Sequence, residues 1–154
     1  ILKSNLYRHI EWPIVIMLAA MIPIGQALES TGITALIATE VVSLAGDLHI
    51  FWVLMIILII TMLITDVINN AATAVIMAPF SVNIALQLGQ PLEPFLMVVA
   101  VGASCAFLTP IGHQCNTLVM GPGNYKFSDY WRLGLPLDIL IVLASIPMIL
   151  FVWL

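Results

Sequence analysis

Charged residues are scarce in this chain of 154 residues. Only 8% of the residues are Asp, Glu, Lys or Arg, whereas 62% are hydrophobic. A soluble domain carries about 25% charged residues, so this composition does not supply a water-facing surface. Four Lys and Arg residues against eight Asp and Glu residues give a formal net charge of -4, which excludes the basic surface that binding to nucleic acid requires. We therefore expect an all-α membrane protein whose solvent is the lipid bilayer.

The chain has only two cysteines, which are too few for a disulfide framework. Cys105 and Cys115 lie in or beside apolar stretches, so we expect reduced packing residues. Their spacing with His113 matches no zinc pattern, and we expect no transition-metal site. The sequence shows no nucleophile–base pair, Gly-rich phosphate loop or paired carboxylates, so we expect no enzyme. The chain begins with Ile1, and its first residues do not have the pattern of a secretory signal, so we expect no signal peptide and a piece of a longer chain.

Long apolar runs dominate what is present. A helix needs about 20 apolar residues to cross the hydrocarbon core of a bilayer. Residues 12–29 and 135–154 satisfy this requirement and are predicted to be transmembrane helices. Residues 33–45 form a shorter run with Glu40 near its middle, which a lipid-facing position disfavours. This run is predicted to be a short interfacial helix.

Polar residues interrupt the apolar segment 50–88. Asp66, Asn69 and Asn70 separate two arms that are each too short for a comfortable span. Burying polar side chains at membrane depth costs free energy, so such residues usually mark a functional site. The pattern therefore favours a re-entrant hairpin with its tip at 66–71, and the alternative is a plain turn outside the membrane.

A second interruption lies in the apolar segment 92–121. Residues 109–117 combine a helix breaker, Pro110, with Gly112 and several side chains that form hydrogen bonds. This loop predicts a broken transmembrane helix, whereas the simpler alternative is a kink at Pro110.

The basic residues support this topology, because Lys and Arg collect in cytoplasmic loops. If residues 33–45 do not cross and the hairpin returns to the side on which it began, all the basic residues lie on one side. Residues 123–134 are then a cytoplasmic connection, and the protein lies in the cell inner (plasma) membrane. The residues placed on the cytoplasmic side are Lys3, Arg8, Lys126 and Arg132.

Two non-helical interruptions at membrane depth suggest binding sites for ions. Unwound backbone leaves carbonyl groups that suit a small cation, and the amino-terminal end of a half-helix attracts an anion. This is the pattern of a secondary transporter.

The two interruptions also resemble a known family. Residues 65–74 and 103–116 are similar to the signature stretches of the divalent-anion/sodium symporters. Residues 121–130 with Gly134 and Pro136 look more like the sulfate-permease-like branch. In that family each half of an inverted repeat carries a re-entrant hairpin and an unwound helix, and this chain is similar to the second half alone.

The resemblance also implies roles for individual residues. It implies sodium as the coupling ion, and it implies the N-terminal half of the same transporter and a homodimer as partners. Independently of the resemblance, the chemistry of Asp66 and His113 makes them candidate proton carriers or structural charges. The implied substrate-binding residues are Asn69, Asn70, Thr73, Asn116 and Thr117, and the implied sodium-binding residues are Asn70, Thr109, Gly112 and Asn116.

Departures from the family pattern bear on the substrate. Asn69 and Ala71 replace the Ser and Thr of the hairpin signature, and His113, Gln114 and Cys115 replace Thr-Pro-Pro in the loop. The lost hydroxyls hydrogen-bond carboxylates in the dicarboxylate branch, so we expect sodium-coupled transport of a small anion such as sulfate rather than a dicarboxylate. The alternatives are a proton-coupled or efflux carrier for citrate-like or arsenite-like substrates and, in another class, a membrane interaction module that transports nothing.

Overall fold

The computed structural model describes residues 49–154 without a gap, and only isolated positions between 16 and 40. The predicted helices at 12–29 and 33–45, with Lys3 and Arg8, lie outside the continuously described part. Every regular element within residues 49–154 is a helix, which confirms the all-helical expectation for this part of the chain. These elements are α4 (Ile50–Thr65), α5 (Asn70–Gln87), α6 (Leu92–Ala103), α7 (Gln114–Met120) and α8 (Phe127–Trp153).

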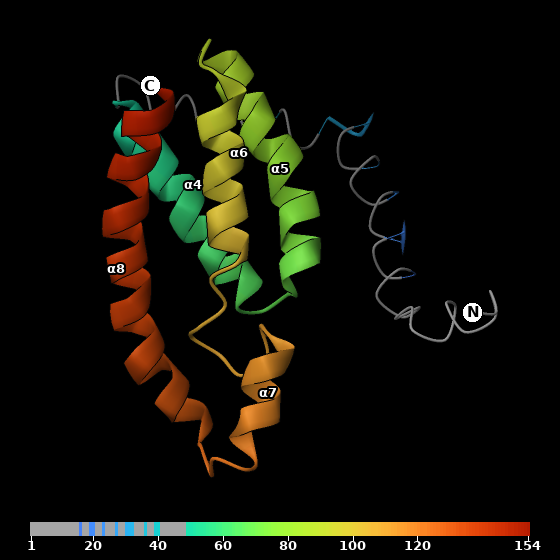
Figure 1. Ribbon diagram of the computed structural model, residues 1–154. Coiled ribbons are helices and arrows are strands. Elements are labelled where there is room, and N and C mark those ends of the chain that lie inside the picture. Colours follow the sequence, from blue (N-terminus) through green and yellow to red (C-terminus); the bar gives the residue numbers. More distant parts are fainter. Residues whose placement is uncertain are drawn as a thin grey trace, which may run out of the picture.

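Helix α6 occupies the centre of the described part. It contacts α4, α5 and α8, and the four helices run side by side with α7 beyond the lower end of α6 (Figure 1). Burial of aliphatic and aromatic side chains between these helices supplies the packing contacts. The side chains that are fully buried in this core include Leu54 and Leu58 of α4, Ile84 of α5, and Phe95 and Val98 of α6.

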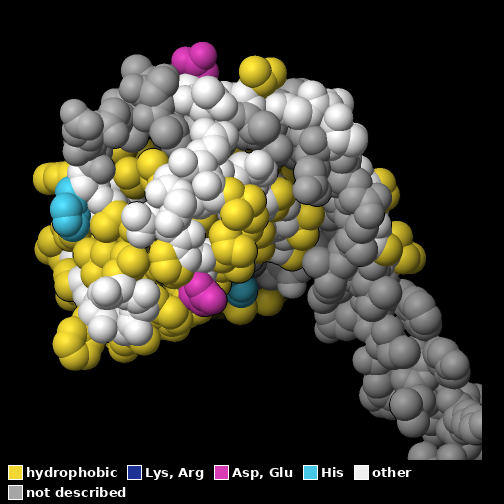
Figure 2. Space-filling model, turned by 90° about the horizontal axis from the view of Figure 1, so that it is seen from above, with side chains coloured by type: hydrophobic (Ala, Val, Ile, Leu, Met, Phe, Trp, Pro, Cys, Tyr) yellow, Lys and Arg dark blue, Asp and Glu magenta, His cyan; other side chains and the backbone are white. Residues whose placement is uncertain are grey.

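Helix α8 has the length and apolarity of a transmembrane helix, the single such helix among the described residues. Its 27 residues correspond to about 40 Å at 1.5 Å per residue, which exceeds the hydrocarbon thickness of about 30 Å. Large apolar side chains on α4 and α8 are exposed, among them Leu63, Leu133 and Phe151. Figure 2 shows hydrophobic side chains over much of the described surface, with few acidic ones. This surface suits contact with lipid or with further protein.

The helix break lies earlier than the sequence predicts. Residues 104–113 are not helical, and α7 already begins at Gln114. Asn116 and Thr117 therefore lie in a helix, which corrects the predicted loop 109–117. The reason is a cap: His113 Nδ1 accepts a hydrogen bond from the backbone N–H of Cys115 at 3.2 Å, and this bond starts the helix.

Helix α8 also begins earlier than expected. Residues 127–134 were predicted to belong to a cytoplasmic connection, but they form the first two turns of α8. The Asp129 carboxylate accepts a hydrogen bond from the backbone N–H of Lys126 at 2.8 Å, as in a capping box. The connection is thus shorter than 123–134.

A buried hydrogen bond joins α5 to α6. The Ser81 hydroxyl donates to the Phe95 carbonyl at 2.9 Å, and both residues are fully buried. Because interhelical hydrogen bonds in membrane proteins contribute about 0.6 kcal/mol on average, we expect Ser81→Ala to lower the thermal midpoint of the full-length protein. The matched control is Ser104→Ala, whose exposed hydroxyl bonds only within its own helix. Equal midpoints for the two variants would show that the Ser81 bond adds nothing.

Candidate functional site

The turn between α4 and α5 contacts the non-helical segment 104–113, and Asp66 makes the contact. The Asp66 backbone carbonyl accepts a hydrogen bond from the Thr109 hydroxyl at 2.6 Å. Its Oδ1 accepts another from the backbone N–H of Leu108 at 3.0 Å. Asp66 is buried, so these bonds satisfy polar groups that lipid cannot. The two interruptions predicted from the sequence thus form one junction, made of residues 65–70 and 103–116.

Thr65 holds the end of α4 against two neighbours. Its hydroxyl lies 2.8 Å from Asn70 Oδ1 and 3.1 Å from the Ala103 carbonyl. The single hydroxyl proton serves one of these acceptors at a time. The last residue of α4, the first residue of α5 and the last residue of α6 therefore meet at one buried hydroxyl.

Gly112 is required where the loop passes the end of α4. A Cβ atom at this position would lie 2.7 Å from the Thr65 carbonyl oxygen and 3.0 Å from the Asp66 Cα. Both neighbours are backbone atoms, so they cannot move aside as a flexible side chain would. The close approach leaves room for hydrogen alone.

Asn116 closes the broken segment from the side of α7. Its Nδ2 donates to the Ala106 carbonyl at 2.8 Å and to the Thr109 carbonyl at 3.1 Å. Its own backbone carbonyl accepts a hydrogen bond from the Tyr130 hydroxyl at 2.7 Å. Asn116 thus links the loop, α7 and α8, and its Oδ1 accepts no hydrogen bond from the described residues.

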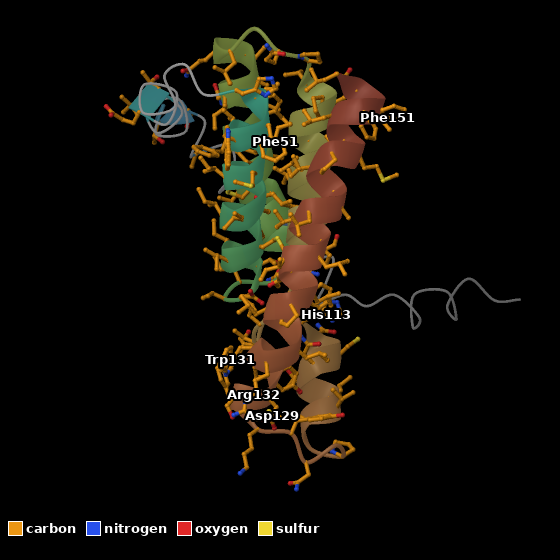
Figure 3. All side chains as sticks on the ribbon, turned by 90° about the vertical axis from the view of Figure 1, so that its left-hand side faces the viewer. Phe51, His113, Asp129, Trp131, Arg132 and Phe151 are labelled. Carbon is orange, nitrogen blue, oxygen red and sulfur yellow. The ribbon has the colours of Figure 1, made fainter. Side chains whose placement is uncertain are left out.

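The other predicted site residues lie around this junction with different environments. Asn69 caps α5, since its side-chain oxygen accepts from the Ala72 N–H at 2.9 Å. Thr73 is fully buried one turn into α5, and its hydroxyl has no partner among the described residues. The Thr117 hydroxyl donates to the Pro110 carbonyl at 2.6 Å. His113 is exposed and caps α7 (Figure 3).

The helix ends that meet at the junction place partial charges of both signs there. Helices α4 and α6 end here, and α5 begins here (Figure 1). The carboxyl ends of helices carry partial negative charge and attract cations, whereas amino ends attract anions. The junction therefore offers carbonyl oxygens to a cation and the amino end of α5 to an anion.

Sequence reasoning missed Asp138 of α8. This residue is 8% exposed, and its Oδ1 has no hydrogen-bond partner within the described part of the chain. The signal was present, because Asp138 is the sole charged residue in the apolar run 135–154. An ionisable residue inside a membrane span is by default a functional-site hypothesis.

The hairpin of α4 and α5 thus contacts a break between two helices, beside a helix long and apolar enough to cross a membrane, as expected for a membrane transporter. Comparison with known families agrees, since residues 10–154 match the family model described as "Citrate transporter". The chain belongs to this family. The comparison also confirms the resemblance to anion transporters drawn from the sequence.

Several curated relatives are named as transporters. An uncharacterized transporter of Synechocystis is 36% identical over 97% of this chain and 24% of the relative. The uncharacterized transporter YfbS of Escherichia coli is 40% identical over 95% of this chain and 24% of the relative. Sodium/sulfate cotransporter 2 of Chlamydomonas reinhardtii is 28% identical over 90% of this chain and 16% of the relative. The chain thus spans about a quarter of the length of its more similar relatives, none of which is named as an enzyme.

Proposed function

We propose that the full-length protein carries out sodium-coupled secondary transport of a small anion, with sulfate favoured over dicarboxylates, by alternating access. The observation that carries the proposal is the junction itself. The carboxyl ends of α4 and α6 and the amino end of α5 meet there beside an unwound segment. This arrangement suits a cation and an anion bound together.

The sodium ion is assigned to the oxygen-rich side of the junction. Asn70, Thr109, Gly112 and Asn116 supply amide and carbonyl oxygens there, which are the ligands that hard cations prefer. Asn116 Oδ1 is free to bind an ion because the bonds of this side chain to the loop use Nδ2.

The anion is assigned to the side of the junction on which α5 begins. Residues 69–73 form the first turn of this helix, where backbone N–H groups favour negative charge. The unpartnered hydroxyl of Thr73 is a further donor. The proposed anion-binding residues are Asn69, Asn70, Thr73, Asn116 and Thr117.

The position of the hairpin tip supports a re-entrant topology. The turn at residues 66–69 lies part-way along α8, which extends beyond it toward α7 (Figure 1). Because α8 is long enough to cross the bilayer, a tip at this level would lie inside the membrane. Arg132 lies at the end of α8 opposite Phe51 and Phe151 (Figure 3), and we assign that end, with Lys126, to the cytoplasm.

We infer the remaining partners of this chain, lipid and further protein, from its exposed apolar surface. The apolar side chains exposed on α4 and α8 would face lipid, the N-terminal half of the same transporter as the other inverted repeat, or a second copy in a homodimer. The 154 residues alone are not expected to transport, because the facing repeat is missing.

Uptake by the full-length protein in proteoliposomes tests this function. We expect radiolabelled sulfate to accumulate under an inward sodium gradient, as the names of the sodium/sulfate cotransporter relatives suggest. Accumulation should not occur with choline in place of sodium. Sulfate uptake that is indifferent to sodium would contradict the proposal.

The second candidate is a proton-coupled or efflux carrier for a citrate-like or arsenite-like substrate. The matching family model carries the description "Citrate transporter". In addition, Asp66 places a buried carboxyl group at the tip of the hairpin. The same proteoliposomes distinguish the two, since citrate movement driven by a proton gradient without sodium would favour this candidate. Membership of a transporter family argues against a membrane interaction module that transports nothing.

A further inference from the structure

Asp138 lies beside the junction, in a cavity that the sodium and anion assignments do not use. The cavity has a volume of about 300 Å³ and lies between α4, α8 and the loop after α6. Its lining is apolar apart from Asp138, and it includes Met62 of α4 and Leu108 of the loop. A carboxyl group in such surroundings is costly unless a positive charge accompanies it.

Asp66 brings a second carboxyl group to the same place. The Oδ1 atom of Asp66 accepts a hydrogen bond from the backbone N–H of Leu108, and Leu108 lines the same cavity as Asp138. Asp66 is 3% exposed and Asp138 is 8% exposed. Each has one oxygen, Oδ2 of Asp66 and Oδ1 of Asp138, that has no partner within residues 49–154. Within this part of the chain, two buried carboxylate oxygens therefore have neither a hydrogen-bond donor nor a positively charged partner.

The basic side chains of the described residues cannot supply this charge. Arg132 lies beside Asp129 at the amino-terminal end of α8, away from the hairpin (Figure 3), and Lys126 directly precedes this helix. Neither forms an ion pair with Asp66 or Asp138. Two like charges close together in a medium of low dielectric repel strongly, so the pair needs either a shared proton or a bound cation.

The loop adds neutral oxygen ligands around this pair. The backbone of α8 passes directly against the Phe107 carbonyl at Gly134, where a Cβ atom would clash with it. The carbonyls of Cys105, Phe107 and Leu108 accept no hydrogen bond from the described residues. A shared proton would satisfy the two carboxylates alone, whereas a metal cation also uses carbonyl oxygens. The surroundings thus favour a metal cation over a proton.

We propose that Asp66 and Asp138, with carbonyl oxygens of the loop 104–108, bind a second sodium ion next to the junction. This site is separate from the one assigned to Asn70 and Asn116. It rests on the proposed function in one respect, the choice of sodium as the ion.

Binding of radioactive sodium to the purified full-length protein, without any anion substrate, tests the proposal. We expect Asp138→Asn to bind one sodium ion fewer per chain than the wild type, and Asp138→Glu to retain it. The control Glu93→Gln removes a carboxylate at an exposed position of α6 and should bind as the wild type does. Unchanged sodium stoichiometry in Asp138→Asn would overturn the proposal.

A companion variant separates this site from the proposed function. Asn70→Ala should lose a different sodium ion, so that the double variant with Asp138→Asn loses two. If Asn70→Ala binds normally while Asp138→Asn loses one ion, the assignment at Asn70 fails and the second site stands.

A measurement on the wild type covers the case in which Asp138→Asn does not fold. Dicyclohexylcarbodiimide modifies carboxyl groups in apolar surroundings, and mass spectrometry locates the modified residue. We expect Asp138 to be modified in choline buffer and protected by sodium in a concentration-dependent manner. Modification of Asp138 at the same rate in both buffers would overturn the proposal.

Discussion

Replacing Asn116 by alanine is expected to reduce sodium-dependent anion uptake by about 100-fold, as misplacement of a binding group by about 1 Å can do. The variant loses both hydrogen bonds from Nδ2 to the Ala106 and Thr109 carbonyls. These carbonyls lie in the non-helical segment, where an unsatisfied backbone group costs several kcal/mol at membrane depth. The proposed sodium site also loses an oxygen ligand, because Oδ1 leaves with the amide.

The control for this variant is Gln114→Ala in the same helix. Gln114 is exposed, and its side chain makes no hydrogen bond within the described part of the chain, so uptake should stay near the wild-type rate. Both variants should be present in the membrane in equal amounts, measured by quantitative immunoblotting. Uptake by Asn116→Ala with unchanged rate and unchanged sodium dependence would remove Asn116 from the site.

Gly112→Val is expected to separate the hairpin tip from the loop. Even the Cβ atom would lie 2.7 Å from the Thr65 carbonyl oxygen, and the two further methyl groups of valine need more space. The loop must then move away from α4, which breaks the bonds of Asp66 to Leu108 and Thr109. We expect uptake to fall by about 100-fold and stability to fall by about 1–3 kcal/mol, the usual cost of overpacking.

Gly121→Val provides the comparison, because a Cβ atom at Gly121 would meet no atom within 4 Å. Uptake and the thermal midpoint of the full-length protein should both remain close to those of the wild type for this control. A Gly112→Val protein that transports as well as the Gly121→Val protein would show that the contact between loop and tip is dispensable.

The sequence predicted the polar interruptions better than it predicted the ends of the helices. Asp66, Asn69 and Asn70 stand out against an apolar background, and the structure places a turn at 66–69 with Asn70 as the first residue of α5. The start of α7 was missed because histidine is not among the preferred capping residues, yet His113 caps that helix through its ring nitrogen. The start of α8 was missed because charged residues near 126–132 resemble a connection, although Asp129 and Lys126 stabilise a helix start.

The contact between the two interruptions could not be read from the sequence alone. It depends on which residues approach across about 40 positions of chain, as Leu108 approaches Asp66. Asp138 was missed for the same reason, because its importance follows from the cavity that it shares with Leu108, which contacts Asp66. Apolar runs reveal which segments lie in the membrane, but they do not reveal which face of each helix meets which neighbour.

Sodium binding at the helix break can be measured directly through the native thiol of Cys115. Cys115 is exposed in the first turn of α7 and adjoins Asn116, whereas Cys105 is buried. The measurement is the rate at which N-ethylmaleimide modifies Cys115 of the full-length protein in sodium and in choline buffer, followed by mass spectrometry. We expect N-ethylmaleimide to modify Cys115 more slowly in sodium than in choline, and more slowly still when sulfate is added. Equal rates for Cys115 in sodium and in choline would contradict sodium binding at the helix break.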